Sequence, residues 1–171
     1  MPTPAYLTAE GANQGPITSG AFTADSVGNI YQEGHEDSVL VQAFEHVVTV
    51  PTDVQSGQPT GNRIHKPLTI TKVFDKSSPL FYNALAHGEQ LTKCELTFFR
   101  TSTDGTQEDY FKITLEDAIV TNIRAFMYNC QDPTKAHFTH LEEISFTYRK
   151  ITWDHTKSGT EGFDDWRAPN T

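Results

Sequence analysis

Apolar and polar residues alternate along several short stretches of the chain. The stretch DYFKITLED (residues 109–117) places Phe111, Ile113 and Leu115 on one face. Such a period of two is typical of a β-strand, because successive side chains point to opposite faces of a sheet. Four other stretches show similar β-forming patterns: QAFEHVVTV (42–50), LTKCELTFF (91–99), AIVTNIRAFM (118–127) and SFTYRKITW (145–153). Turn residues separate these stretches, and their spacing predicts an all-β barrel or sandwich.

The segment TSTDGTQ (101–107) between two of these stretches contains Asp104 followed by Gly105. An Asp-Gly pair is typical of hairpin turns in which both residues have positive φ. We therefore expect residues 91–99 and 109–117 to form a β-hairpin.

The first strand of this hairpin contains one of the two cysteines in the chain. Its alternation places on one face Thr92, Cys94, Leu96 and Phe98. Cys94 is therefore expected to be a core thiol rather than a nucleophile. Two cysteines do not make a disulfide framework, and folding in a reducing cytosol is expected.

The last predicted strand carries its apolar residues in two different parities. Phe146 and Tyr148 share one parity, whereas Ile151 and Trp153 share the other. A switch of this kind indicates either a β-bulge or a strand that covers the core at one end and another surface at the other. The second alternative suggests a partner subunit, with Phe146 and Tyr148 packing the barrel and Trp153 meeting a neighbour.

One helix is predicted within KSSPLFYNALAHGEQ (76–90). Ser78 can cap it, Pro79 suits its first turn and Gly88 suits a left-handed stop. An apolar stripe at helical spacing consists of Leu80, Phe81, Ala84 and Leu85. A lone short helix of this kind is expected to plug an open end of the barrel or to cover a sheet.

A long segment, residues 51–67, contains three prolines and two glycines and no pattern typical of a strand or helix. Long irregular segments in compact domains tend to be functional or disordered. One alternative is a loose surface loop. The other is an extended arm that reaches a neighbouring subunit, because Val54 and Ile64 would otherwise be exposed to water.

The C-terminal tail, residues 156–171, is polar but keeps Phe163 and Trp166. Aromatic residues in such a tail are expected to dock, either on the barrel or on a partner. With no internal repeat or linker, the chain is interpreted as a single domain over residues 1–171.

Charge and hydropathy exclude some classes of partner. With 13 basic and 22 acidic residues, the formal net charge is −9. This sign argues against nucleic acid, since phosphate binding requires a basic surface. No apolar run approaches the ~20 residues of a membrane span, so no membrane insertion is expected. The opening MPTPAYLTAEG lacks a basic region followed by an apolar segment, and no signal peptide is expected.

The candidate chemistry is sparse. His137 and His140 have a spacing that suits a helical metal site, but on an extended segment their rings point to opposite faces. Asp154 and His155 follow the expected end of the last strand, and no G-x-S-x-G nucleophile motif is present. We therefore predict no catalytic, cofactor-binding or metal-ligating residue and no cofactor.

Three long stretches, taken together, resemble a known family. They are HKPLTITKVFDKSSPLFYNALAHGEQLTKCEL (65–96), QEDYFKITLEDAIV (107–120) and FTYRKITWDH (146–155). They closely resemble the Hcp family (haemolysin co-regulated protein), the tube subunit of bacterial type VI secretion. AYLTAEG near the start and EHVVTVPTDVQSGQPTGNRIHKP (45–67) are similar to the same family.

The resemblance implies a compact β-barrel of two packed antiparallel sheets, with one short helix at its side and a long extended loop. It further implies a hexameric ring, stacked into a hollow tube inside a contractile sheath and capped by tip (spike) proteins. Such a tube is built in the cytoplasm and propelled out of the cell or into a target cell, and it can carry small effectors in its lumen. The short polar tail argues against an appended toxin domain.

A head-to-tail ring needs two different contact patches on each subunit. We expect the subunit and ring contacts to include Val54, Gln58, Arg63, Ile64 and His65 in the arm, together with Trp153, Phe163 and Trp166. The alternatives are a phage-type tail tube protein, a free secreted ring or effector protein and, more remotely, a ligand-binding β-barrel or an enzyme.

Overall fold

Eleven strands hydrogen-bond into one sheet and two more form a separate ribbon in the computed structural model, which describes residues 3–28 and 33–168. The order along the large sheet is β13-β12-β9-β8-β10-β11-β7-β4, with β1 joined to β8 and with β2 and β3 joined to β1. The strands are β1 (Ala5–Gly11), β2 (Gly15–Pro16), β3 (Val39–Val41), β4 (Ala43–Glu45), β5 (Val48–Thr49), β6 (Ile64–His65), β7 (Leu68–Val73), β8 (Gln90–Thr101), β9 (Gln107–Glu116), β10 (Ala118–Phe126), β11 (Leu141–Thr147), β12 (Lys150–His155) and β13 (Thr160–Asp165).

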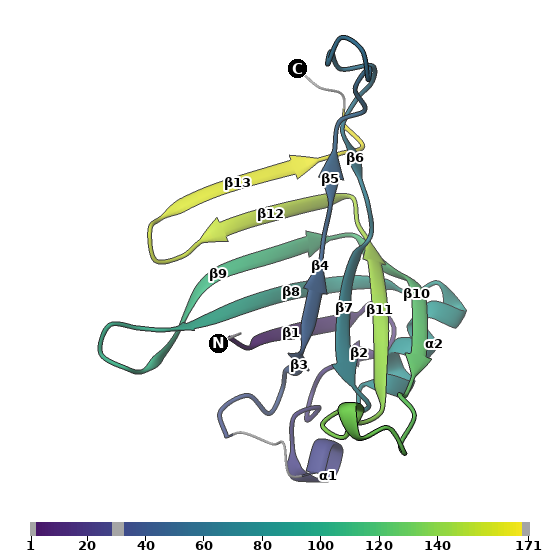
Figure 1. Ribbon diagram of the computed structural model, residues 1–171, viewed down its shortest axis with the longest axis vertical. Coiled ribbons are helices and arrows are strands. Elements are labelled where there is room, and N and C mark those ends of the chain that lie inside the picture. Colours follow the sequence, from purple (N-terminus) through teal and green to yellow (C-terminus); the bar gives the residue numbers. More distant parts are fainter. Residues whose placement is uncertain (1–2, 29–32, 169–171) are drawn as a thin grey trace.

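The predicted fold class is confirmed. The protein is mainly β, its antiparallel sheets curl into a half-barrel, and one helix stands out at the side (Figure 1). The core cluster draws on β1, β7, β8, β9, β11 and β12. Its fully buried members include Leu7, Ile70, Phe81, Ile144, Phe146 and Ile151.

The side helix is α2 (Ser78–His87), which lies against β10. Pro79 occupies its first turn, Gly88 ends it in the left-handed conformation, and Phe81 and Ala84 are buried as the apolar stripe predicts. Ser78 is not the cap, because the helix already begins there and its hydroxyl donates to Glu142 at 2.7 Å. The remaining helical segments are α1 (Ala24–Val27) and the 3-10 helix η2 (Pro133–Lys135).

The predicted hairpin is present as β8 and β9. Its turn is longer than a two-residue loop, and Gly105 has a positive φ of 89° whereas Asp104 does not. Asp104 instead accepts a hydrogen bond from the Thr106 hydroxyl at 2.8 Å, which holds the turn through its side chain.

Cys94 and Leu96 are buried, so the prediction of a core thiol is confirmed. Burial raises the pKa of the Cys94 thiol to about 12. Thr92, by contrast, is exposed, because Glu10 pairs with Lys93 whereas Gly11 pairs with Leu91. This irregularity passes over Thr92 and turns Leu91 into the core.

The stretch 145–153 is two strands, which corrects the interpretation of its parity switch. β11 pairs with β10 and β7, and β12 pairs with β9 and β13. The chain turns between them at Tyr148 and Arg149, so Phe146, Tyr148 and Ile151 all face the same core. The switch is therefore neither a bulge nor a two-faced strand. Asp154 and His155 lie inside β12 rather than beyond its end.

The polar tail also contains regular structure. Residues 160–165 form β13, which pairs along its whole length with β12. Among the described residues, no helix combines the length and apolar character needed to cross a membrane.

Candidate functional site at the base of the arm

Residues 46–67 form an arm that rises from the body of the molecule (Figure 1). Residues 51–67 were expected to lack secondary structure, but the arm is a narrow two-stranded ribbon. Val48 pairs with His65, and a further β-bridge joins Thr52 to Pro59. Gly57 turns the tip with a positive φ of 73°. The backbone hydrogen bonds of the ribbon are therefore made within the arm itself.

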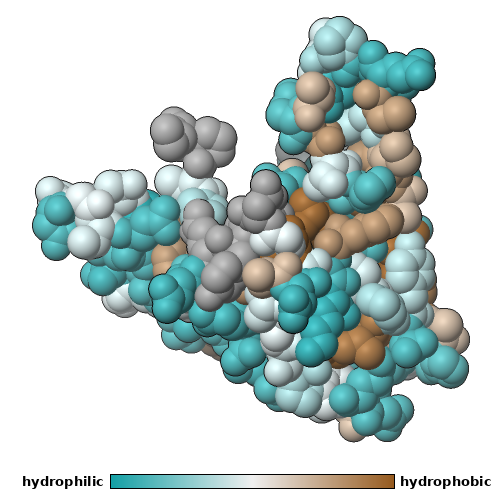
Figure 2. Space-filling view, turned by 90° about the horizontal axis from the view of Figure 1, so that it is seen from below, coloured by the Kyte–Doolittle hydropathy of each residue, from teal (hydrophilic) through white to brown (hydrophobic). Residues whose placement is uncertain are grey.

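The flanks and tip of the arm are apolar and exposed. Val54, at the tip, is 99% exposed, and Ile64 is 45% exposed. Further exposed apolar side chains in or beside the arm are Phe44, Val47, Val48 and Val50. Seen from below, hydrophobic side chains gather along one projecting part of the molecule and in the angle beside it, whereas the other projecting part is mostly hydrophilic (Figure 2). Apolar surface concentrated in this way is typical of an interaction site.

A chain of hydrogen bonds joins the base of the arm to the corner between β11 and β12. The Tyr148 hydroxyl lies 2.7 Å from His46 Nε2 and 2.7 Å from His65 Nδ1. The other nitrogen of His65, Nε2, lies 2.7 Å from Asp164 Oδ2 in β13. Burial, and next the charge of Asp164, raises the pKa of Tyr148, so this hydroxyl keeps its proton.

Arg63 fastens the same part of the arm to β13. Its Nε donates to Asp164 Oδ2 at 2.9 Å and its terminal nitrogen to Asp164 Oδ1 at 3.0 Å. The same nitrogen also donates to the carbonyls of Asp165 and Ala168, at 2.9 and 3.1 Å. These hydrogen bonds, followed by the bond from His65, lower the pKa of the Asp164 carboxyl. A two-pronged contact of this kind sets both the distance and the orientation of the ribbon.

Two tryptophan rings enclose the histidines. Trp153 of β12 is nearly parallel to His65, with 20° between the rings and centroids 6.5 Å apart. Trp166 lies 5.6 Å from His65 on a second side, and its indole nitrogen donates to the Tyr148 carbonyl. Burial, and next the neighbouring His65, lowers the pKa of His46.

The structure brings together four of the predicted contact residues at this base: Arg63, His65, Trp153 and Trp166. Both tryptophans pack partly buried against the core of their own chain, so the tail aromatic Trp166 docks on the barrel. The exposed members are Ile64 on the flank of the arm, Val54 and Gln58 at its tip, and Phe163 on β13, which is 66% exposed.

Sequence reasoning missed His46 and Asp164 and assigned Tyr148 to packing alone. These residues lie far apart along the chain and no short motif contains them. The alternation in QAFEHVVTV placed His46 in a strand, yet it lies between β4 and β5, where the arm leaves the sheet. Topology, rather than spacing, places the three side chains together.

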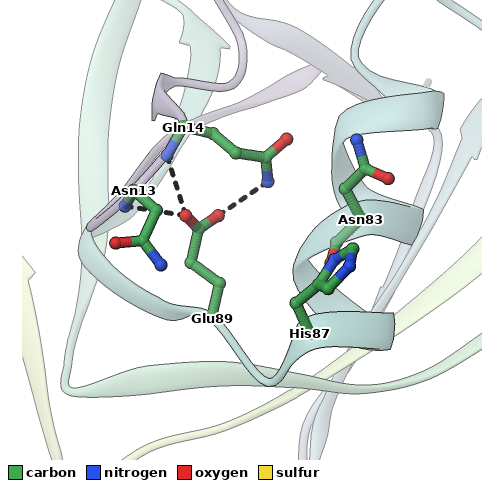
Figure 3. A pocket seen from close by; sticks show the side chains of 5 residues that line it. All are labelled: Asn13, Gln14, Asn83, His87 and Glu89. Carbon is green, nitrogen blue, oxygen red and sulfur yellow. Dashed lines mark hydrogen bonds between the residues drawn. The ribbon is translucent and has the colours of Figure 1, made fainter.

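A separate hollow of about 250 Å³ lies between the first turn of the chain and the end of α2 (Figure 3). Glu89 accepts from the backbone amides of Asn13 and Gln14, at 2.7 and 2.8 Å, and from the Gln14 side chain at 2.6 Å. Burial opposes the charge of Glu89, but these bonds lower its pKa overall. The carboxylate is thus engaged in holding the β1–β2 turn.

Metal binding and catalysis find little support in the side-chain geometry. Across residues 3–28 and 33–168, no three His, Cys, Asp or Glu side chains are grouped as metal ligands. His137 packs on Phe138 and His140 on Phe74, so the two rings face different neighbours.

The family model described as "Type VI secretion system effector, Hcp" matches residues 6–155. The chain belongs to the Hcp family. It is 64% identical over 169 residues to the "Major exported protein" of Pseudomonas aeruginosa PAO1, which covers 99% of this chain and 98% of that protein. A solved structure described as "Crystal structure of Hcp protein" has a TM-score of 0.91 at 50% identity, covering 96% of this chain and all of that one. The "Secreted protein Hcp3" from Pseudomonas aeruginosa has a TM-score of 0.83 at 55% identity, covering 98% of this chain and all of that one.

The resemblance stated from the sequence is confirmed, and so is its implication for the fold. The match to the Hcp family includes the whole arm and ends at His155, so β13 lies beyond it. The Asp164 end of the arm's fastening is therefore formed by a part of this chain outside the matched residues.

Proposed function

We propose that the protein is the tube subunit of a type VI secretion system, which forms hexameric rings that stack into a hollow tube. The observation that carries the proposal is the arm, an apolar ribbon that leaves the body of its own subunit. Val54 is almost fully exposed at its tip, yet the base is held by five side-chain hydrogen bonds from His46, Arg63 and His65 to Tyr148 and Asp164. A rigidly held apolar projection is suited to insertion into a neighbouring subunit, because little ordering entropy remains to be lost.

The sheet supplies further contact surfaces of the kind a ring needs. β13 and β4 stand at the two ends of the strand path, and in the described part of the chain each pairs on one side. Unpaired edges and unequal patches favour head-to-tail contact between copies, which closes into a ring when the rotation fits. Phe163 on β13, which lies under the Lys150 ammonium at 4.7 Å, is one expected contact.

Export completes the proposal. Two relatives are described as an exported and a secreted protein, and we extend this behaviour to the present chain. The tube is assembled in the cytoplasm within a contractile sheath, meets the tip proteins at its end, and leaves the cell when the sheath contracts. Small effector proteins are the proposed cargo of the lumen, and the charge of −9 per subunit gives the assembled tube a strong field toward them.

The test is the mass of the purified protein by light scattering, together with negative-stain images of the same peak. A ring is expected at six times the 19.1 kDa of the chain, with an open centre. A protein that stays monomeric at high concentration would contradict the ring.

The arm is tested by Val54→Asp, which puts a charge on the exposed apolar tip. Stacking of rings, or ring formation itself, is expected to weaken at least tenfold in concentration, because a buried unpaired charge costs more than ~1.4 kcal/mol. The matched control is Gln55→Asp, which adds the same charge at the neighbouring exposed position. Equal effects of the two substitutions would show that net charge, rather than the apolar tip, is responsible.

A further inference from the structure

The base of the arm contains two histidines that share one hydroxyl group. His46 enters from the start of the arm, His65 from its returning strand, and the Tyr148 hydroxyl lies between them. We infer that His46, Tyr148, His65 and Asp164 form a proton-sensitive latch, which holds the arm when both imidazoles are neutral and releases it in mild acid. The inference rests on the proposed function for its consequence, the control of ring stacking, but the latch itself is a property of the single chain.

With both imidazoles neutral, one arrangement of protons satisfies every contact. Asp164 can only accept, so His65 Nε2 carries the proton and His65 Nδ1 is left with a lone pair. The Tyr148 hydroxyl then donates to His65 Nδ1, and its oxygen accepts from His46 Nε2. The chain of donation runs in one direction, from His46 to Asp164, and all three distances are 2.7 Å.

One added proton reverses this chain without breaking it. When His65 becomes a cation, its Nδ1 donates to the Tyr148 oxygen, and the hydroxyl turns to donate to His46 Nε2. Each group still has a partner, so the latch tolerates a single proton.

A second proton cannot be accommodated in the same way. Both imidazolium rings would then donate to the one Tyr148 oxygen, and the hydroxyl proton would have no acceptor in the chain. The two cations would also lie with ring centroids 6.5 Å apart. Tyr148 is 2% exposed, so water does not readily replace the lost partner. Separation of the arm from the corner relieves both conflicts.

The surroundings offer the two cations little compensation. From β13, Asp164 is already neutralised by Arg63, and Asp165 is held by Arg149 from the corner. Trp153 of β12 and Trp166 present aromatic rings to the histidines. From the arm itself, Lys66 adds a positive charge next to His65 in the chain, and Glu45, next to His46, is exposed.

The direction of the pH effect follows from His46. Its pKa is lowered by burial and by His65, so the detached arm takes up the proton more readily than the latched arm. The latch is therefore fully effective above the ordinary histidine pKa of ~6.5 and weakens as the pH falls through and below that value. Each unit by which the pKa differs between the two states makes release about tenfold more frequent in acid.

Hydrogen exchange followed by mass spectrometry tests the latch on the full chain. Exchange of peptides from residues 46–66, corrected for the intrinsic pH dependence of amide exchange, is expected to be about tenfold faster at pH 5 than at pH 7.5. Emission of the two tryptophans, both adjacent to His65, is expected to change over the same pH range.

Two variants decide the outcome. His46→Gln keeps a donor for the Tyr148 oxygen but takes up no proton, so the acid-dependent acceleration is expected to vanish. Tyr148→Phe removes the shared oxygen and is expected to speed exchange of the arm at every pH, with a smaller step. His87→Gln, an exposed histidine on α2, is the matched control and is expected to keep the full step.

An unchanged acid step in His46→Gln would overturn the latch, as would an equal loss of the step in His87→Gln. Should His46→Gln fail to fold, an acid step of full size in Tyr148→Phe would overturn it instead. Light scattering of the same samples keeps the two proposals apart. A chain that is monomeric at pH 7.5 contradicts the ring, whereas the exchange data decide the latch in a monomer or a ring alike.

Discussion

Two polar clusters hold this subunit together, one under helix α2 and one at the base of the arm. Under α2, the buried Lys72 ammonium is ion-paired with Glu142 and with Asp75, the latter at 3.0 Å. The Ser78 hydroxyl accepts from Lys72 at 2.9 Å and donates to Glu142 at 2.7 Å. At the arm, by contrast, imidazole and phenol groups carry most of the contacts, and Asp164 remains partly exposed.

The difference is one of permanence. Lys72 and Glu142 are both 0% exposed, so removal of either charge leaves the other without water or a partner. Such a cluster locks β7, β11 and the start of α2 into one arrangement. The arm is fastened by groups that change protonation near neutral pH, and it can therefore be released while the body stays folded.

The largest expected effect comes from breaking the permanent cluster. Lys72→Met leaves Glu142 and Asp75 without their cation and is expected to lower the free energy of unfolding by ~3–5 kcal/mol. Urea denaturation measures the change. Lys93→Met, at an exposed lysine of β8, is the control and is expected to change it by less than ~0.5 kcal/mol. A loss below ~1 kcal/mol at Lys72 would remove the contrast between the two clusters.

A smaller effect, confined to the arm, is expected from Arg63→Lys. Lysine keeps the charge but loses the two-pronged contact with Asp164, so hydrogen exchange across residues 46–66 is expected to rise several-fold while the urea midpoint stays nearly constant. Arg124→Lys is the matched control, because Arg124 makes a similar two-pronged contact with Glu143 on an exposed face of the sheet. If both variants loosen the arm equally, Arg63 does not act locally.

The smallest expected effect separates release of the arm from unfolding of the body. The Cys94 thiol is buried and its pKa is raised to about 12, so it should resist iodoacetamide at pH 8, whereas the exposed Cys130 reacts. Arg63→Lys is expected to leave this protection unchanged, and Lys72→Met to reduce it. Alkylation of Cys94 in Arg63→Lys as fast as in Lys72→Met would show that the arm and the body open together.

Local patterns predicted much of the fold. The alternation around Ile113 and Leu115 and the Asp104-Gly105 turn identified the long hairpin, and the stop at Gly88 identified the end of α2. These features depend on residues within a few positions of one another. The corner at Tyr148 and Arg149 was misinterpreted as a change of face, because a parity switch within one strand and a turn between two strands look the same along the chain.

The arm divides in the same way. Its composition indicated a projecting segment, and the structure confirms that Val54 is exposed. Its ribbon pairing was not predicted, because a two-stranded arm rich in proline and glycine has no face that alternates against a core. The strand β13 was hidden for a similar reason, since its TEGFDD sequence is polar on both faces and is recruited by pairing with β12.

The sequence by itself determined the β class, the side helix, the core thiol and the family, because alternation, capping residues and extended similarity are all local or linear properties. Tertiary structure alone decided that His46, His65, Tyr148 and Asp164 meet at one point. These residues come from four segments that sheet topology brings together, and their chemistry depends on distances of 2.7 Å that no linear pattern encodes. A histidine in the sequence is a titratable group, and the fold turns two of them into a joint.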